Sequence, residues 1–253
     1  AIVVSGVSQV VSSLTNFGIL LYLVRVMEKT GFGLYGLGFA FTMLLAGLAT
    51  ALIAVQFVVN LPDQSVDQRS LYAANHLAAL AVIGIGALVL ASVCSIALGW
   101  MELISNEIAQ LGVSMALAAA GYGVRDLLMR FAFSDRREAI VLSTNIAVAF
   151  AVTTAFAVIA LLDLGLDASL ALMVYGIGQI AGALFALWLL RLPIQRTRVD
   201  GVCRAFRDSW RGGRWSMLTS LAYNLRTQSH SFVIGPLLGA AALADLHASR
   251  VLV

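Results

Sequence analysis

Seven long apolar stretches constrain what this chain can fold into. Each is about as long as the roughly 20 mostly apolar residues that a helix needs to cross a bilayer. The stretches are too long for barrel strands and lack alternation of polar and apolar residues, so they are predicted to be helices. They run over residues 3–24, 35–60, 71–99, 109–131, 139–162, 168–190 and 215–239.

The composition agrees with a membrane protein. Hydrophobic residues make up 60% of the 253 residues and charged residues only 11%, whereas soluble domains typically carry about 25% charged residues. A water-soluble fold of this length could not bury so much apolar surface in one core. The predicted fold is therefore all-α, a polytopic bundle of transmembrane helices.

The Lys and Arg residues between the apolar stretches predict the topology. The breaks at 61–70, 130–138 and 191–214 hold eleven of them, whereas the breaks at 25–33, 100–108 and 163–167 hold two. Because basic loops stay on the cytoplasmic side, we expect the three basic breaks and the N-terminus to be cytoplasmic. The eleven are Arg69, Arg130, Arg136, Arg137, Arg191, Arg196, Arg198, Arg204, Arg207, Arg211 and Arg214, and the two are Arg25 and Lys29.

The long break at 191–214 predicts a boundary between two helical bundles. We expect a six-helix lobe over residues 1–192, a basic cytoplasmic linker over 193–214 and the first helix of a second lobe over 215–253. Residues 199–215 either form an amphipathic helix lying on anionic headgroups or a solvated basic linker.

The two ends of the sequence and a weak internal repeat bear on the same division. The chain opens on Ala1 without a basic leader and stops in an apolar stretch at 250–253, so we expect it to be part of a longer protein. In the first stretch, and again in the seventh, polar residues near the middle of the helix are followed by small residues where the helix ends. Such similarity between the starts of two halves is typical of a two-lobed transporter.

Two segments resemble a known family. The first, within the first sixty residues, comprises Ser5-Gly6-Val7-Ser8-Gln9, Arg25 and Gly31-Phe32-Gly33-Leu34-Tyr35-Gly36-Leu37. The second is Phe232-Val233-Ile234-Gly235-Pro236-Leu237-Leu238-Gly239. On these residues the chain resembles the polysaccharide and O-antigen flippases of the multidrug/oligosaccharidyl-lipid/polysaccharide exporter superfamily. That family has two bundles of six helices, so the resemblance implies one complete lobe plus the start of a pseudosymmetric second. His230-Ser231-Phe232 stands where the family often has an Asp.

The resemblance implies a transporter and no enzyme. Its substrate would be a polyprenyl-pyrophosphate-linked oligosaccharide, moved across the bacterial cytoplasmic membrane by alternating access. Two other functions remain open, a multidrug or small-molecule exporter of the same architecture and a membrane scaffold that transports nothing. No cofactor and no nucleic-acid partner are expected; the expected partners are the lipid-linked oligosaccharide and anionic membrane lipids at 193–214.

Charged side chains inside spanning helices indicate where the cargo binds, because each costs about 2.5–3.5 kcal/mol at the centre of the bilayer. Asp126 and Arg130 are four residues apart with the acid first, which predicts an intrahelical ion pair. Arg125 projects about 100° away from Asp126. It either offers a cation to a phosphate or reaches the cytoplasmic interface along its own stem.

Arg226 is the second cationic candidate. It lies about eleven residues, or roughly 16 Å, into the seventh stretch, which predicts a position near the middle of the membrane. His230 follows one turn later. The candidate cavity residues are therefore Arg226, Arg125, His230, Asn16 and Asn224.

Several chemistries lack a sequence signal. The chain has no zinc-like Cys/His cluster, no phosphate-binding Gly-Lys-Ser loop and no Ser-His-Asp arrangement, and no metal site is expected. Cys94 and Cys203 are predicted to lie at opposite sides of the membrane and to stay unpaired. Apart from Asp126, each acid lies in or near a break, which favours an anionic cargo over a cationic drug.

Overall fold

The computed structural model describes residues 2–102 and 105–251, which are helical almost throughout and include no strand. This confirms the all-α prediction. The helices are α1 (Ile2–Val26), α2 (Lys29–Ala49), the π-helical η1 (Thr50–Ala54), α3 (Val55–Asn60), α4 (Val66–Trp100), α5 (Asn106–Ser134), α6 (Glu138–Leu161), α7 (Ala168–Leu190), the 3₁₀-helical η2 (Ile194–Arg196), α8 (Val199–Leu238) and α9 (Ala240–Val251).

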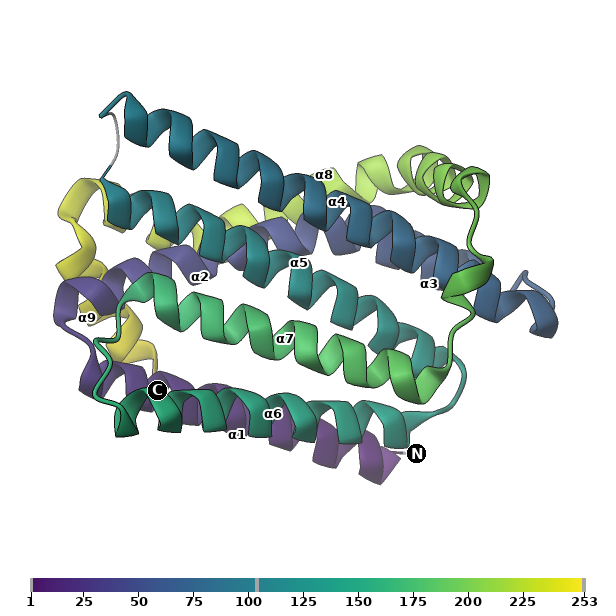
Figure 1. The fold of residues 1–253 in the computed structure, drawn as a ribbon, viewed down its shortest axis with the longest axis horizontal. Coiled ribbons are helices and arrows are strands. Elements are labelled where there is room, and N and C mark those ends of the chain that lie inside the picture. Colours follow the sequence, from purple (N-terminus) through teal and green to yellow (C-terminus); the bar gives the residue numbers. More distant parts are fainter. Residues whose placement is uncertain (1, 103–104, 252–253) are drawn as a thin grey trace.

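Five helical segments are long and apolar enough to span a membrane, by length and composition. They are Val3–Val26, Lys29–Asn60, Val66–Trp100, Glu138–Leu161 and Ala168–Leu190. The second combines α2, η1 and α3. The other two predicted spans, at 109–131 and 215–239, are helical but fall outside this set. In α5, which lies between α4 and α7 (Figure 1), the charged, polar and small residues lower the hydropathy.

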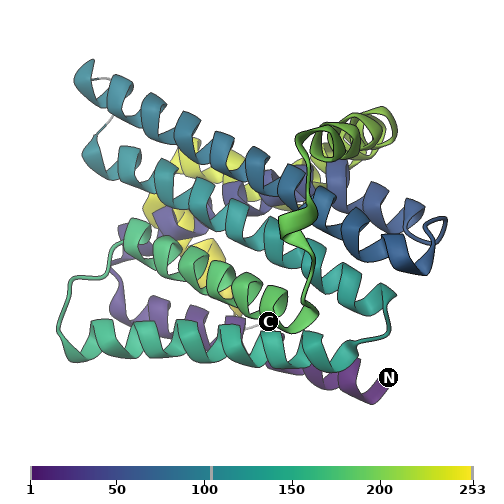
Figure 2. The same ribbon diagram turned by 45° about the vertical axis from the view of Figure 1, so that its right-hand side comes forward.

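Helix α5 is the centre of the arrangement. It packs against α4 on one side and α7 on the other, while α6 lies beyond α7 and α1 packs on α6 (Figures 1 and 2). α5 and α7 approach each other closely, since a Cβ on Gly176 would meet the backbone of Ala118 at 2.9 Å. Small residues at such contacts let two membrane helices approach backbone to backbone.

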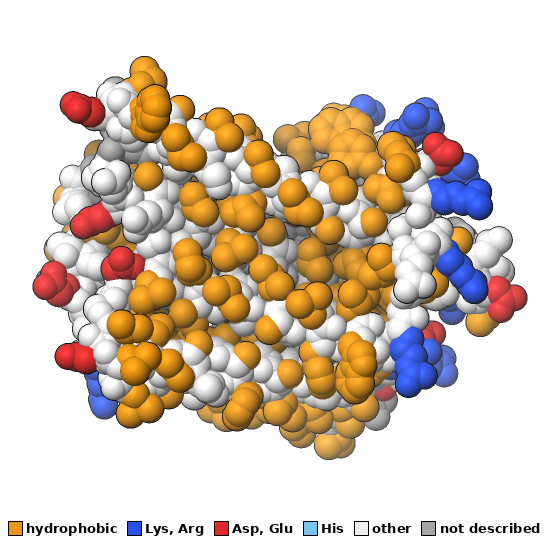
Figure 3. Space-filling view, in the orientation of Figure 1, with side chains coloured by type: hydrophobic (Ala, Val, Ile, Leu, Met, Phe, Trp, Pro, Cys, Tyr) orange, Lys and Arg blue, Asp and Glu red, His pale blue; other side chains and the backbone are white. Residues whose placement is uncertain are grey.

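Charge is segregated to the two ends of the bundle. Figure 3 shows most Lys and Arg side chains gathered at one end, with a few acidic side chains among them, mainly acidic side chains at the other end, and a broad hydrophobic band between the two. The chain path brings the breaks at 61–70, 130–138 and 191–214 to the basic end (Figure 1). The alternation predicted from the sequence therefore matches the fold, while the side that faces the cytoplasm stays a prediction.

The basic break at 191–214 is largely helical. It comprises η2 and the first half of α8, which continues without interruption to Leu238. Gly239, with a φ of 85° that favours glycine, then separates α8 from α9. The division into two lobes and a linker stays a prediction. Cys94 and Cys203 are both free, as expected.

Candidate substrate cavity

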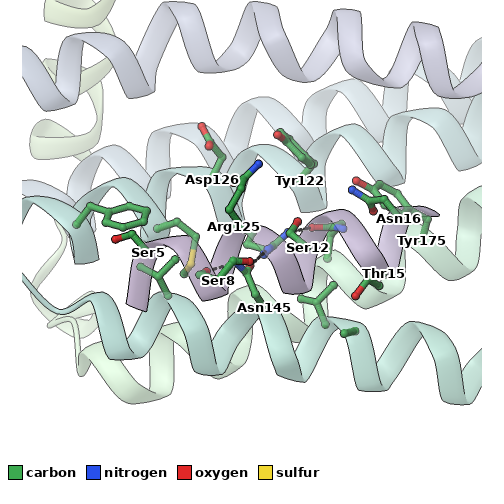
Figure 4. Close-up of a pocket in the computed structure, with 17 residues that line it drawn as sticks. Ser5, Ser8, Ser12, Thr15, Asn16, Tyr122, Arg125, Asp126, Asn145 and Tyr175 are labelled. Atoms are coloured by element: carbon green, nitrogen blue, oxygen red, sulfur yellow. Dashed lines mark hydrogen bonds between the residues drawn. The ribbon is translucent and has the colours of Figure 1, made fainter. Parts of the chain in front are cut away.

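A polar cavity of about 220 Å³ lies inside the bundle between α1, α5, α6 and α7. Tyr122, Arg125 and Met129 are spaced three and four residues apart, so they share the face of α5 that lines it. α6 contributes Asn145, and α7 contributes Tyr175 and Gln179, as the close-up in Figure 4 shows in part. The cavity is thus built from residues that are far apart in the sequence.

A chain of hydrogen bonds connects all four helices through Arg125. Its Nη1 donates to Oε1 of Gln179 at 2.6 Å, and its Nη2 donates to Oδ1 of Asn145. The Asn145 amide in turn donates to Oγ of Ser8 at 2.6 Å. α5, α7, α6 and α1 each contribute one side chain to this chain. The guanidinium is therefore held by side chains inside the bundle.

Among the described residues, the positive charge of Arg125 has no carboxylate partner. The ion pairs in the described residues are Lys29–Asp245, Arg130–Asp126 and Arg137–Asp135. Both hydrogen-bond acceptors of Arg125 are neutral amide oxygens, and its buried Nε has no partner within the described part of the chain. The cavity consequently contains a guanidinium with an unused donor, which suits an anionic ligand.

Asp126 also lines the cavity but is bound to other groups. Its Oδ2 accepts a hydrogen bond from Nε of Arg130 at 2.7 Å, which confirms the predicted intrahelical pair. The same oxygen accepts a longer hydrogen bond, at 3.3 Å, from the hydroxyl of Thr50 in the π-helical turn. These two contacts occupy Oδ2 of Asp126, and no ion pair between Asp126 and its neighbour Arg125 forms in the described part of the chain.

The wall contributed by α1 carries a row of hydroxyl groups. Ser5, Ser8, Ser12 and Thr15 follow one another at three- and four-residue spacing, and Asn16 ends the row (Figure 4). We missed this row in the sequence because each residue alone fits helix–helix hydrogen bonding. The signal was the spacing, which places all of them on one face of a helix.

The five predicted site residues fall in two places. Arg125 and Asn16 line the polar cavity, whereas Arg226 is exposed on α8 and outside it. Asn224 donates to the Ser220 carbonyl at 2.8 Å, on the α8 face that packs on α2. His230 lies beside His247, with ring centroids 6.2 Å apart. The structure does not bring these three to Arg125, and their proposed roles stay predictions.

A second cavity, of about 290 Å³, adjoins the first and shares Asn16 and Tyr175 with it. Its other walls are mainly aromatic and apolar residues of α2, with Gln228 of α8 and His247 of α9. Among the residues that the structure describes, no group of three His, Cys, Asp or Glu side chains could hold a metal ion.

Comparison with known proteins agrees with the resemblance noted in the sequence. A sequence model of the family described as "Polysaccharide biosynthesis protein" matches residues 1–252, nearly the whole chain. No curated protein and no solved structure matches it. The chain therefore belongs to this polysaccharide biosynthesis family, the family of the polysaccharide and O-antigen flippases.

Proposed function

We propose that this protein moves a polyprenyl-pyrophosphate-linked oligosaccharide from the cytoplasmic to the outer leaflet by alternating access. Membership of the family supports a general role in polysaccharide export, and the lipid-linked cargo and its binding site are the finer part of the proposal. One observation carries it: within the described part of the chain Arg125 is a cation without a carboxylate partner, inside a cavity whose lining is rich in hydroxyls and amides.

The energetics favour a functional reason for this arginine. A cation at membrane depth is costly, and partnering it with a carboxylate would reduce that cost. Here the available carboxylate, Asp126, is bound to Arg130 and Thr50 instead. An uncompensated guanidinium is what a phosphate-binding cavity requires, since its planar donors fit two phosphate oxygens at once.

Cargo binding would proceed by exchange of hydrogen bonds. Phosphate oxygens would replace the amide oxygens of Gln179 and Asn145 on the guanidinium. The sugar hydroxyls would meet the hydroxyl row of α1 and the amides, while the lipid tail stays in the bilayer. The lobes would then rock to open the cavity on the other side. No covalent step is part of this proposal.

The two alternative functions fit the cavity less well. A cationic drug would be repelled by Arg125, which lacks a carboxylate partner among the described residues. A scaffold without transport activity would be expected to have an apolar, tightly packed interior, whereas this interior is polar and hollow. The basic end of the bundle is taken as cytoplasmic, in line with the distribution of Lys and Arg.

Substitution of Arg125 in the full-length protein tests the proposal. We expect Arg125→Ala to lose export of surface polysaccharide in cells lacking the native flippase, because removing one partner of a buried charge contact costs about 2–5 kcal/mol. Arg125→Lys should restore part of the export, since it keeps the charge but loses the planar donors. Membrane abundance is measured in parallel to exclude a folding defect.

Arg226→Ala is the matched comparison, because Arg226 is the second predicted cation but is exposed and lies outside the cavity. Export close to the normal level would leave Arg125 as the essential cation, whereas a cargo-binding role for Arg226 predicts loss of export. Normal export by Arg125→Ala at normal abundance would contradict the proposed phosphate site. Loss of export in Arg226→Ala, with Arg125→Ala unaffected, would place the essential cation on α8 instead.

A further inference from the structure

The first half of α8, residues 199–215, has three different faces. One face carries Gly201, Ala205, Ser209 and Gly213, four residues apart, and packs on the bundle. A Cβ on Gly213 would collide with the backbone of Leu52 in η1, and one on Gly201 would meet the Asn75 side chain of α4. These small residues seat the helix directly on its neighbours, so its orientation is fixed by packing.

The second face is apolar and exposed. Val199, Phe206 and Trp210 are 78%, 42% and 47% exposed, and Cys203 is exposed beside them. At 100° per residue these four side chains fall within about 60° of the helix circumference. The Phe206 and Trp210 rings stack with their centroids 6.4 Å apart. An aromatic patch of this kind on an otherwise basic helix calls for an apolar environment.

The third face is basic. Arg204, Arg207, Arg211 and Arg214 are exposed and fall within about 80° of the circumference, next to the apolar face. Asp200 shares this sector at the start of the helix, so the sector keeps a net positive charge. None of the four takes part in an ion pair within the described residues. Arg214 instead lies over the Trp215 ring, 5.7 Å from its centroid.

The position of this half of α8 fits a membrane surface. Figures 1 and 2 show its first turns running across the long direction of the bundle, whereas the rest of α8 runs alongside it. It lies at the end where Lys and Arg gather, beyond the hydrophobic band (Figure 3). A helix that runs across the bundle at this level would lie in the plane of the bilayer, along its edge.

We propose that residues 199–215 form an interfacial helix that binds the headgroups of anionic phospholipids. The apolar face enters the boundary between headgroups and acyl chains, and the arginines contact lipid phosphates. An acidic soluble partner would use the basic face but leave Phe206 and Trp210 exposed to water. Only a lipid surface would contact both the apolar face and the basic face next to it. The site is separate from the polar cavity and does not depend on the proposed cargo.

A fluorophore on Cys203 tests this proposal, because Cys203 lies on the apolar face. The full-length protein, with Cys203 as its single cysteine, is reconstituted in equal parts phosphatidylcholine and phosphatidylglycerol, and one lipid at a time carries a nitroxide quencher. We expect stronger quenching by phosphatidylglycerol. Arg207→Gln with Arg211→Gln should weaken that preference on the order of 25-fold, since each arginine near an anionic surface contributes about fivefold.

The control is Arg136→Gln with Arg137→Gln, which removes two charges from the loop between α5 and α6 at the same end. It should leave the preference near its native value. High salt should reduce the preference of the unchanged protein, because it screens exposed charges. Equal quenching by both lipids, absence of quenching by either, or an equal loss in the control pair would each overturn the proposal.

Discussion

The two sides of α5 carry cavities of similar size and opposite chemistry. Toward α1, α6 and α7 lies the polar cavity of about 220 Å³ with Arg125 and its amide partners. Toward α4 lies a cavity of about 210 Å³ whose lining consists of apolar side chains and glycine, among them Leu80, Ile83 and Ala119. One helix thus separates a polar interior from an apolar one.

This difference shows that chemistry, rather than size, assigns a function to a cavity in a membrane protein. Apolar cavities stay dry, whereas polar ones hold water that satisfies buried groups. The apolar side of α5 stabilises the bundle through close packing with α4. The polar side holds a charge that packing does not require. We therefore expect cargo on one side of α5 only.

The largest expected effect comes from adding the same charge to each side. Ala119→Asp places a carboxylate in the apolar cavity and should destabilise the protein by about 2.5–3.5 kcal/mol, the insertion cost of such a charge. Asn145→Asp places one beside Arg125, where an ion pair compensates it. Thermal unfolding in detergent and membrane abundance measure both.

Asn145→Asp should nevertheless abolish export, because the new carboxylate neutralises the cation that binds the cargo. A stable protein without export is the outcome that separates the two sides most clearly. If both Asp variants were equally destabilised, the polar cavity would not differ in solvation from the apolar one. If Asn145→Asp exported normally, the charge of Arg125 would not be needed.

A smaller effect is expected where α5 contacts α7. Gly176→Val would push a side chain into the backbone of Ala118 and should cost about 1–3 kcal/mol, as overpacking does. The cavity should suffer too, because Gln179, which accepts from Arg125, follows Gly176 by one turn. Gly86→Val on α4 is the control, since a Cβ there meets nothing within 4 Å. Equal unfolding midpoints of the two variants would contradict the close contact.

The sequence predicted what depends on local pattern. Long apolar runs identified the five spans confirmed by length and composition, and the four-residue spacing identified the Asp126–Arg130 pair. It also singled out Arg125, because a charge in an apolar run stands out. It could not supply the partners of Arg125, since Asn145 and Gln179 lie 20 and 54 residues away and meet it only through packing.

Arg226 illustrates what the sequence could not settle. Its depth was counted from a helix start at residue 215, but α8 begins at Val199. Which side of a long helix faces the bundle is decided by contacts with other helices, and Arg226 is exposed. Likewise, a π-helical turn at Thr50–Ala54 interrupts an apolar run, and no feature of that run predicts it.

The smallest effect is expected at that turn, where Thr50 reaches α5. Thr50→Val removes the 3.3 Å hydrogen bond to Asp126 and should cost about 0.6 kcal/mol, the average for such bonds between membrane helices. Thr42→Val is the control, because its hydroxyl donates to the Gly38 carbonyl of its own helix. Thr50 helps to hold Asp126 away from Arg125. Export by Thr50→Val should therefore fall by more than the small loss of stability alone would cause. If Thr50→Val costs as much in an Asp126→Ala background as alone, the two residues are not coupled, and Asp126 is kept from Arg125 by Arg130 alone.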